Sequence, residues 1–256
     1  MDRLLYEKII SKKEFSNLVK KDVEMAFKQF DKAHLIDEEK VKKTRDLLRK
    51  SFSVFGSGKL LNSNIVDKKG VDEILKKHLS TRERFEDYNE LYEKFMNGII
   101  KGSVIDLGCG INGLSYGYLR KGTSYLGVES VGQFVDLANY YFKTKGIEEA
   151  EVIQESLFNL DKIEKIIKKI PEKKVVFLFK VIDSLEMLEK NYSKELLKRI
   201  VPLVDRVVVS FATESLVSRK KFRVKRYWFE NFIEEEFNVI DIFELGGEKY
   251  FFFKLK

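Results

Sequence analysis

A glycine-rich loop follows an apolar run near residue 105 and has the composition of a cofactor-binding loop. Residues 104–114 read VIDLGCGINGL, in which Asp106, Gly108, Cys109 and Gly110 follow the apolar residues. Glycines let the backbone turn tightly and approach a ligand beyond the carboxyl end of a strand. The G-x-G pattern alone is weak evidence, because dinucleotide enzymes share it. Its place inside the loop favours Cys109 as a small buried residue over a nucleophile.

Polar residues also end the next two predicted strands. The order D-L-G-C-G, with an acid directly before the loop, favours S-adenosylmethionine over a dinucleotide, and we expect Asp106, Gly108, Cys109 and Gly110 to bind it. Glu129 ends the second strand, where its carboxylate could accept hydrogen bonds from ribose hydroxyls; an exposed strand-end charge is the alternative reading. After the third strand, the side chains that could hold an adenine are those of Glu155, Ser156 and Leu157.

Strands and helices alternate from residue 100 onward, and this alternation positions those residues. It predicts a doubly wound, mostly parallel sheet, the outline of a class I (Rossmann-like) methyltransferase domain over residues 80–256. The short Leu245–Glu248 turn should pair the last two strands antiparallel, making a seven-stranded mixed sheet. The predicted strands are 103–106, 125–129, 151–154, 175–179, 206–210, 237–244 and 249–254.

Residues 1–79 show helical spacing and no strand-like run, which predicts a separate N-terminal helical domain. Ser11 with Glu14 has capping-box spacing, so a helix should follow it as far as Phe30. Further helices are expected over 37–52 and 71–79, with a polar connection over 60–70.

Positive charge is concentrated in two places. Of the net charge of +7, residues 1–80 supply +6, with 19 Lys and Arg against 13 Asp and Glu. Such patches attract polyanions such as nucleic acid, although solvated charged faces account for them equally well. The second patch is SRKKFRVKR, residues 218–226, where the expected RNA-binding residues are Arg219, Lys220, Lys221, Arg223, Lys225 and Arg226.

Composition excludes several other classes of protein. With 35% charged and 44% hydrophobic residues, the chain of 256 residues is typical of a soluble globular protein. No apolar run approaches the roughly 20 residues of a membrane span, and the N-terminus lacks the apolar core of a secretory signal. A single cysteine excludes an internal disulfide and a cysteine-cluster zinc site. We therefore expect a cytoplasmic monomer without a metal.

Several motifs in order resemble one enzyme family. HLSTRERFEDYNELY (78–92) followed by VIDLGCGING is similar to the H-x-S-[ST]-x-E-R element and glycine loop of the aminoglycoside-resistance 16S rRNA (guanine-N7) methyltransferases of the Arm/Rmt type. The match continues in LFKVIDSLE (178–186), VVSFATESL (208–216) and YWFENF (227–232). The resemblance covers roughly residues 75–256, and the chain is identified as a divergent member of this family.

This resemblance implies roles for individual residues. Arg84 would hold the methionine carboxylate of S-adenosylmethionine, a task that suits a guanidinium. His78 would lie at the cofactor site or pack against its loop. Ser80 and Glu83 also have capping-box spacing, so a helix beginning there would carry Arg84 toward the cofactor.

The implied substrate is a guanine in the decoding region of 16S rRNA, the aminoglycoside-binding A site, within the 30S subunit. The N-terminal domain would dock on the rRNA through phosphate contacts. Because helical rRNA hides its base edges, the guanine would be flipped out. N7 has a free lone pair, so transfer needs alignment and no general base. The residues expected to position the base are Phe179, Lys180, Phe211 and Trp228.

One segment departs from the family pattern and leaves alternatives open. Residues 210–222 read SFATESLVSRKKF where many members have S-F-P-[TV]-x-S-L-x-G-R-x-K-G-M. The segment shapes the target side, so the cofactor follows more firmly than the nucleotide. A housekeeping rRNA modifier, a methyltransferase for another RNA or a small molecule, and a non-catalytic RNA-binding homologue are the alternatives.

Overall fold

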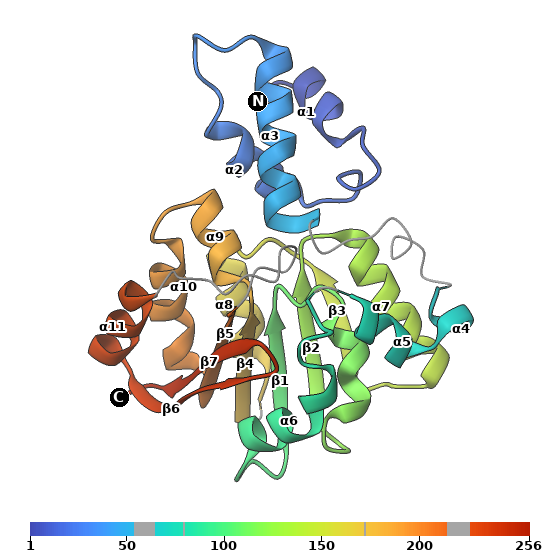
Figure 1. The fold of residues 1–256 in the computed structure, drawn as a ribbon, viewed down its shortest axis with the longest axis vertical. Coiled ribbons are helices and arrows are strands. Elements are labelled where there is room, and N and C mark those ends of the chain that lie inside the picture. Colours follow the sequence, from blue (N-terminus) through green and yellow to red (C-terminus); the bar gives the residue numbers. More distant parts are fainter. Residues whose placement is uncertain (54–64, 79, 172, 214–225) are drawn as a thin grey trace.

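Seven strands form one mixed sheet at the centre of the molecule, in the order β3-β2-β1-β4-β5-β7-β6 (Figure 1). The computed structural model describes residues 1–53, 65–78, 80–171, 173–213 and 226–256. Strands β1 to β5 pair in parallel, whereas β7 is antiparallel to both β5 and β6. The predicted class I methyltransferase fold is confirmed. The strands are β1 (Gly102–Leu107), β2 (Ser124–Glu129), β3 (Ala150–Gln154), β4 (Lys173–Phe179), β5 (Arg206–Ala212), β6 (Asn238–Leu245) and β7 (Glu248–Lys254).

The strand order reverses between β1 and β4, and this reversal determines where a ligand can bind. β1 pairs with β2 on one side and with β4 on the other, so the connections leaving the carboxyl ends of β1 and β4 diverge. Ligands of doubly wound sheets bind in the crevice at this point. Every residue of β1 is buried, including Ser103 and Asp106, because β1 is a central strand of the parallel sheet.

Helices cover both faces of the sheet. The 3₁₀ helix η3 contacts both α6 and α7 on one face, and α8, α9 and α10 form the second group. Successive strands β1, β2 and β3 are added toward one edge of the sheet, and β4 and β5 are added toward the other edge. Because connections between parallel strands are right-handed, the helices of the second group lie on the opposite face. The helices of this part are η2 (Phe85–Asp87), α6 (Tyr88–Met96), η3 (Asn112–Tyr118), α7 (Gly132–Lys145), α8 (Leu160–Lys169), α9 (Ile182–Leu188), α10 (Tyr192–Ile200), η4 (Val201–Leu203) and α11 (Tyr227–Glu236).

The first helices of the chain form a separate layer at the carboxyl ends of the strands, at the top of Figure 1. This N-terminal helical unit contains α1 (Arg3–Ile10), α2 (Lys20–Lys28), α3 (Asp37–Leu48) and the π-helix η1 (Arg49–Ser53). Leu18 forms an isolated antiparallel bridge with Val131, just after β2. The Gln29 side chain donates hydrogen bonds to the carbonyls of Met187 and Leu188 in α9. The unit is therefore anchored on both sides of the strand-order reversal.

The expected helix from Ser11 to Phe30 is wrong in detail. Asp2 caps α1 by accepting from the Leu5 amide at 2.8 Å, and Ser11 ends this helix, its hydroxyl donating to the Lys8 carbonyl. A second helix, α2, follows only at Lys20. The turns between the two helices still bury Phe15 and Leu18, so the apolar spacing over this segment reflects burial without a continuous helix.

Helices α4 (Ile65–Lys69) and α5 (Val71–Lys77) pack on the sheet part of the molecule rather than on the N-terminal helical unit. α5 contacts η3, and the Tyr118 hydroxyl donates to Asp72 at 2.9 Å. α4 is a helix in the segment that was expected to be a polar connection. None of the helices in the described ranges is long and apolar enough to cross a membrane.

Candidate active site

The glycine loop lies at the strand-order reversal and is shaped by two glycines with positive φ. Gly108 has φ of +71° and Gly110 has φ of +54°. A Cβ at Gly108 would lie 2.5 Å from a methyl group of Val181, so this position also requires the absence of a side chain. A Cβ at Gly110 would meet no atom within 4 Å. The loop therefore packs tightly against the start of α9 at Gly108 and leaves open space at Gly110.

Next to this loop is a cleft of about 790 Å³ that is open to solvent. Eight residues expected at the cofactor or base site line it: Arg84, Gly108, Cys109, Gly110, Glu129, Leu157, Phe179 and Lys180. The other described lining residues are Asp22, Ser51, Phe52, Ser80, Ser130, Phe134, Phe158, Val181, Ser184, Leu185 and Leu188.

Glu129 is a buried carboxylate in the wall of the cleft. One oxygen accepts from the Gly110 amide and the other from the Val131 amide, both at 2.8 Å. Burial raises the pKa of Glu129 to about 7, and the two amide donors partly oppose this effect. The side chain therefore fixes the glycine loop, and each oxygen keeps a lone pair for a ligand hydroxyl.

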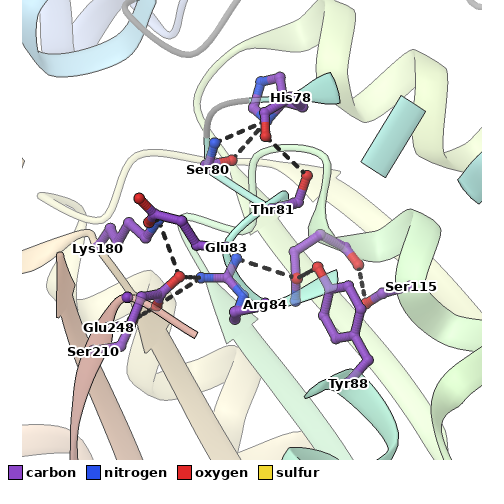
Figure 2. A network of polar contacts seen from close by, with 12 residues as sticks. His78, Ser80, Thr81, Glu83, Arg84, Tyr88, Ser115, Lys180, Ser210 and Glu248 are labelled. Carbon is purple, nitrogen blue, oxygen red and sulfur yellow. Dashed lines mark hydrogen bonds and ion pairs between the residues drawn. The ribbon is translucent and has the colours of Figure 1, made fainter. Parts of the chain in front are cut away.

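Arg84 is 2% exposed and is held by a carboxylate of its own chain (Figure 2). Its Nη1 donates to both oxygens of Glu248, at 2.7 and 2.9 Å. The guanidinium lies 4.7 Å from the ring centroid of Phe179. Its Nε has no hydrogen-bond partner among the described residues. Arg84 therefore lines the cleft as a fixed cation whose Nε donor is not used by the described residues.

Lys180 directly follows β4, in a backbone conformation that is unusual for a lysine. Its φ is +58°, which costs a non-glycine residue about 1 kcal/mol or more. Its ammonium pairs with Glu83 and lies 3.0 Å from Glu248, which also accepts from the Ser210 hydroxyl at 2.6 Å. Two cations and two carboxylates thus neutralise one another beside the cleft (Figure 2). Strained backbone of this kind is concentrated at functional sites.

The expected helix start at Ser80 is wrong. Residues 80–84 form turns, and α6 begins only at Tyr88. Glu83 is drawn away from a capping role by its ion pair with Lys180. The Ser80 hydroxyl lies 2.7 Å from Nδ1 of His78, whose ring is edge-on to Phe134. Ser80 and Phe134 line the cleft and His78 does not, so the structure places His78 behind its wall.

Asp106 also lies behind the cleft wall. Its Oδ2 accepts from the Asn112 amide at 2.7 Å and from the Tyr125 hydroxyl at 2.9 Å, and burial raises its pKa to about 6. Asn112 in turn accepts from the Tyr88 hydroxyl at 2.8 Å. Asp106 therefore ties the glycine loop to the helix that follows Arg84. The glycine loop leads directly into the 3₁₀ helix η3.

The residues after β3 divide between the cleft and other contacts. Glu155 accepts from the Asn159 side chain and pairs with Lys162 in α8, away from the cleft. Ser156 is fully buried behind the lining, and Leu157 lines the cleft. Only Leu157 of the three is therefore in direct reach of a ligand.

Two of the residues expected to position a base are not at the cleft. Phe211 is 1% exposed and packs against Phe229 and Phe251, with ring centroids 5.0 and 5.7 Å away. Trp228 is 38% exposed on α11, edge-on to Phe229. Phe211 therefore belongs to the core between β5, β7 and α11, and Trp228 to the surface of α11.

Most of the second basic cluster lies outside the described residues. Arg226 is described, and its guanidinium pairs with Asp183 at 2.6 Å. Five expected RNA-binding residues fall in the segment 214–225 that the structure does not describe: Arg219, Lys220, Lys221, Arg223 and Lys225.

Asp22, Ser51 and Phe52 of the N-terminal helical unit also line the cleft, a contribution that the sequence did not predict. Asp22 is 1% exposed and accepts from the hydroxyls of Ser130 and Ser156. It lies four residues from both Leu18 and Ala26, on the buried side of α2. The position of Asp22 on the apolar side of a helix was a signal in the sequence that this acid has a specific partner, because a buried acid requires one.

The cleft at the reversal, its glycine loop and the acid at the end of β2 are the features of a class I methyltransferase fold. Residues 3–250 match the family model described as Ribosomal RNA methyltransferase (FmrO). The chain therefore belongs to this family of ribosomal RNA methyltransferases, which confirms the resemblance found in the sequence.

Individual proteins and solved structures are also similar to this chain. The 16S rRNA (guanine(1405)-N(7))-methyltransferase of Serratia marcescens is 26% identical over 186 residues, 72% of this chain and 70% of that protein. The structure of the 16S rRNA methyltransferase RmtF with S-adenosyl-L-homocysteine has a TM-score of 0.81 at 22% identity, with both chains fully covered. The 16S rRNA methylase RmtB gives 0.80 at 20% identity, covering 98% of this chain and 97% of that one. The structural likeness extends to the N-terminal helices.

Proposed function

We propose that this protein transfers the methyl group of S-adenosylmethionine to N7 of a guanine in the decoding region of 16S rRNA, within the 30S subunit. The observation that carries the proposal is the cleft that joins Arg84, the glycine loop and Glu129 in a chain of an rRNA methyltransferase family. The guanine and its N7 atom are supported by the Serratia marcescens relative.

The lining of the cleft fits the proposed cofactor. Arg84 keeps an unpartnered Nε for a carboxylate, and Glu129 presents carboxylate oxygens to ribose hydroxyls. Leu157 and Phe158 offer apolar surface for an adenine. Gly110 leaves open space where a side chain would intrude. When bound, the cofactor supplies an electrophilic methyl group on a sulfonium.

The residues at the cleft would act by holding the reactants. N7 of guanine carries a lone pair at neutral pH, so no side chain has to remove a proton before transfer. Lys180, whose geometry is fixed by Glu83 and Glu248, and Phe179 lie at the cleft where the base would enter. Alignment of two held reactants can account for most of such a rate enhancement.

We assign docking on rRNA to the basic surface of the N-terminal helical unit. A groove between α1 and α3 contains more cations than acids, the acids being Glu38 and Asp46. Contacts from these cations to phosphates would position the enzyme without reading sequence. The cations of the groove are Lys8, Lys12, Lys42, Arg45 and Arg49.

The test is transfer of labelled methyl from S-adenosylmethionine to purified 30S subunits, with naked 16S rRNA and a small-molecule pool in parallel. We expect label in 16S rRNA of intact subunits, and much slower labelling by enzyme that carries Arg84→Ala at a cofactor concentration below the wild-type Kd. Label confined to another RNA or to small molecules would overturn the substrate. No cofactor binding and no transfer would favour a non-catalytic RNA-binding protein.

Aminoglycoside resistance would follow from the proposed product. Methylation at N7 gives the guanine a positive charge, which repels the polycationic drugs that bind the decoding region. Cells that express the protein should therefore tolerate higher aminoglycoside concentrations than cells that express the Arg84→Ala variant.

A further inference from the structure

The N-terminal helical unit forms part of the wall of the cofactor cleft. Asp22 comes from α2, and Ser51 and Phe52 come from η1. The contacts around them are specific: the Gly132 amide donates to the Asn17 carbonyl at 2.7 Å, and the Val19 amide donates to the Ser130 carbonyl at 3.1 Å. The unit is therefore seated on the loop after β2, beside Glu129.

Asp22 is the charged group that this unit brings to the cleft. Its two oxygens accept from the hydroxyls of Ser130 and Ser156, which follow β2 and β3. Each carboxylate oxygen can accept two hydrogen bonds, so these two donors leave acceptor capacity unused. No Lys or Arg forms an ion pair with Asp22 among the described residues. A buried carboxylate with only neutral donors gains from a further donor on a ligand.

The order of strands places Asp22 at one end of the cleft. Lys180 lies at the end of β4 and Glu129 at the end of β2. Arg84 lies beside Lys180, because both side chains pair with Glu248. Asp22 and Leu157 lie farther along the edge, toward β3. An elongated cofactor with its carboxylate at Arg84 and its ribose at Glu129 would bring its adenine to Asp22.

We propose that Asp22 is a cofactor-binding residue, whose carboxylate accepts a hydrogen bond from the exocyclic amine of the adenine. This inference rests on the proposed use of S-adenosylmethionine. It makes the N-terminal helical unit a part of the cofactor site as well as a docking surface. The hydroxyls of Ser130 and Ser156 hold the carboxylate in place for that contact.

The test compares two ligands that differ only in the amine. Affinities for S-adenosylhomocysteine and for its 6-deamino analogue, with hydrogen in place of the amine, are measured by calorimetry on the full chain. The wild-type protein should prefer S-adenosylhomocysteine by about tenfold or more, the scale of a hydrogen bond to a charged group. Asp22→Ala should bring the ratio close to one, and Asp22→Asn, a neutral acceptor, should give an intermediate ratio.

Controls separate this contact from a structural role. Unfolded molecules bind neither ligand, so the ratio of affinities is unaffected by partial loss of fold. Glu24→Ala removes an exposed acid from the same helix, where it pairs with Lys20, and should keep the wild-type ratio. An Asp22→Ala ratio equal to that of wild type would overturn the assignment of Asp22 alone. No binding of S-adenosylhomocysteine by wild type would overturn the proposed function as well.

Discussion

Arg84 is the residue on which the proposed cofactor site most depends. Arg84→Ala should weaken S-adenosylhomocysteine binding by about 1 to 3 kcal/mol, because charge-assisted hydrogen bonds to the ligand carboxylate are lost. Calorimetry measures this, with thermal unfolding to confirm that the variant is folded. Arg82→Ala is the matched control, because Arg82 lies on the same turn and is not in the cleft lining. Equal affinity of the Arg84→Ala variant and wild type would remove Arg84 from the site.

Glu129 should make the stability of the ligand-free protein depend on pH. Its folded-state pKa is raised from 4.5 to about 7, so the folded protein binds more protons than the unfolded chain between these values. The contribution of Glu129 to the free energy of unfolding therefore falls as pH rises through that window, by about 3 kcal/mol. Glu129→Gln cannot ionise, so its stability relative to wild type should rise by that amount from pH 4.5 to pH 8. Urea unfolding at the two pH values measures the difference, and an equal difference at both would contradict the assignment.

Individual residues were predictable from the sequence where a motif fixes both the backbone and the side chain. The glycine loop and Glu129 lie at the cleft because strand ends and positive-φ glycines define it. Glu248 was not predictable as the partner of Arg84, because a contact between residues 84 and 248 depends on the β5–β7 pairing. Phe211 was misplaced because an aromatic residue after a strand suits a core as well as a base-binding face.

At the scale of elements, the β6–β7 hairpin supports the segment that carries Arg84. Gly246 in its turn has φ of +59°, and a Cβ there would lie 2.2 Å from the Glu83 carbonyl. Gly246→Ala should therefore lower the free energy of unfolding by roughly 1 to 3 kcal/mol more than Gly146→Ala. Gly146 is the matched control, because its φ is +64° and nothing lies within 4 Å of its added Cβ.

Urea unfolding of both variants measures this difference. We also expect weaker cofactor binding only for Gly246→Ala, because the displaced Glu83 adjoins Arg84. Equal loss of stability in the two variants would show that backbone strain alone matters, and that the hairpin does not brace this segment.

The elements themselves were predicted unevenly, for physical reasons. Strands of a buried parallel sheet are apolar runs, so β1 to β5 were found, and the short turn at Leu245–Glu248 predicted the antiparallel pairing of β6 and β7. The order of the strands in the sheet was not predicted. Capping-box spacing was misleading twice, at Ser11 and at Ser80. In both places the side chains had stronger uses: Ser11 ends α1, and Glu83 pairs with Lys180. Capping-box spacing therefore does not fix the start of a helix where one of its side chains makes another contact in the folded protein.

At the scale of the whole molecule, positive charge on the N-terminal helical unit should govern binding to the 30S subunit. Lys12 and Lys42 are exposed in the groove between α1 and α3. Replacing both with Ala should weaken subunit binding. The plot of log binding constant against log salt concentration should become less steep by roughly one to two, because fewer counterions are released. Filter binding at several salt concentrations measures the slope. Cofactor affinity should not change.

A charge-matched control tests whether position matters. Lys165 and Lys169 are exposed on α8, so replacing both with Ala removes the same charge elsewhere. This variant should keep the wild-type slope. Equal slopes for the two double variants would contradict the assignment of docking to the groove.

The sequence predicted the basic N-terminal part but not its contribution to the cleft, because that contribution depends on how α2 and η1 pack against the loop after β2.

The most direct test of the proposed function is the mapping of N7-methylguanosine in 16S rRNA from treated 30S subunits. Borohydride and aniline cleave RNA at this base, so the position of the methyl group is read from the fragment lengths. We expect one new cleavage in the decoding region, only with intact subunits and S-adenosylmethionine together. Methyl transfer to the subunits without a cleavage, or with cleavage only elsewhere, would contradict it.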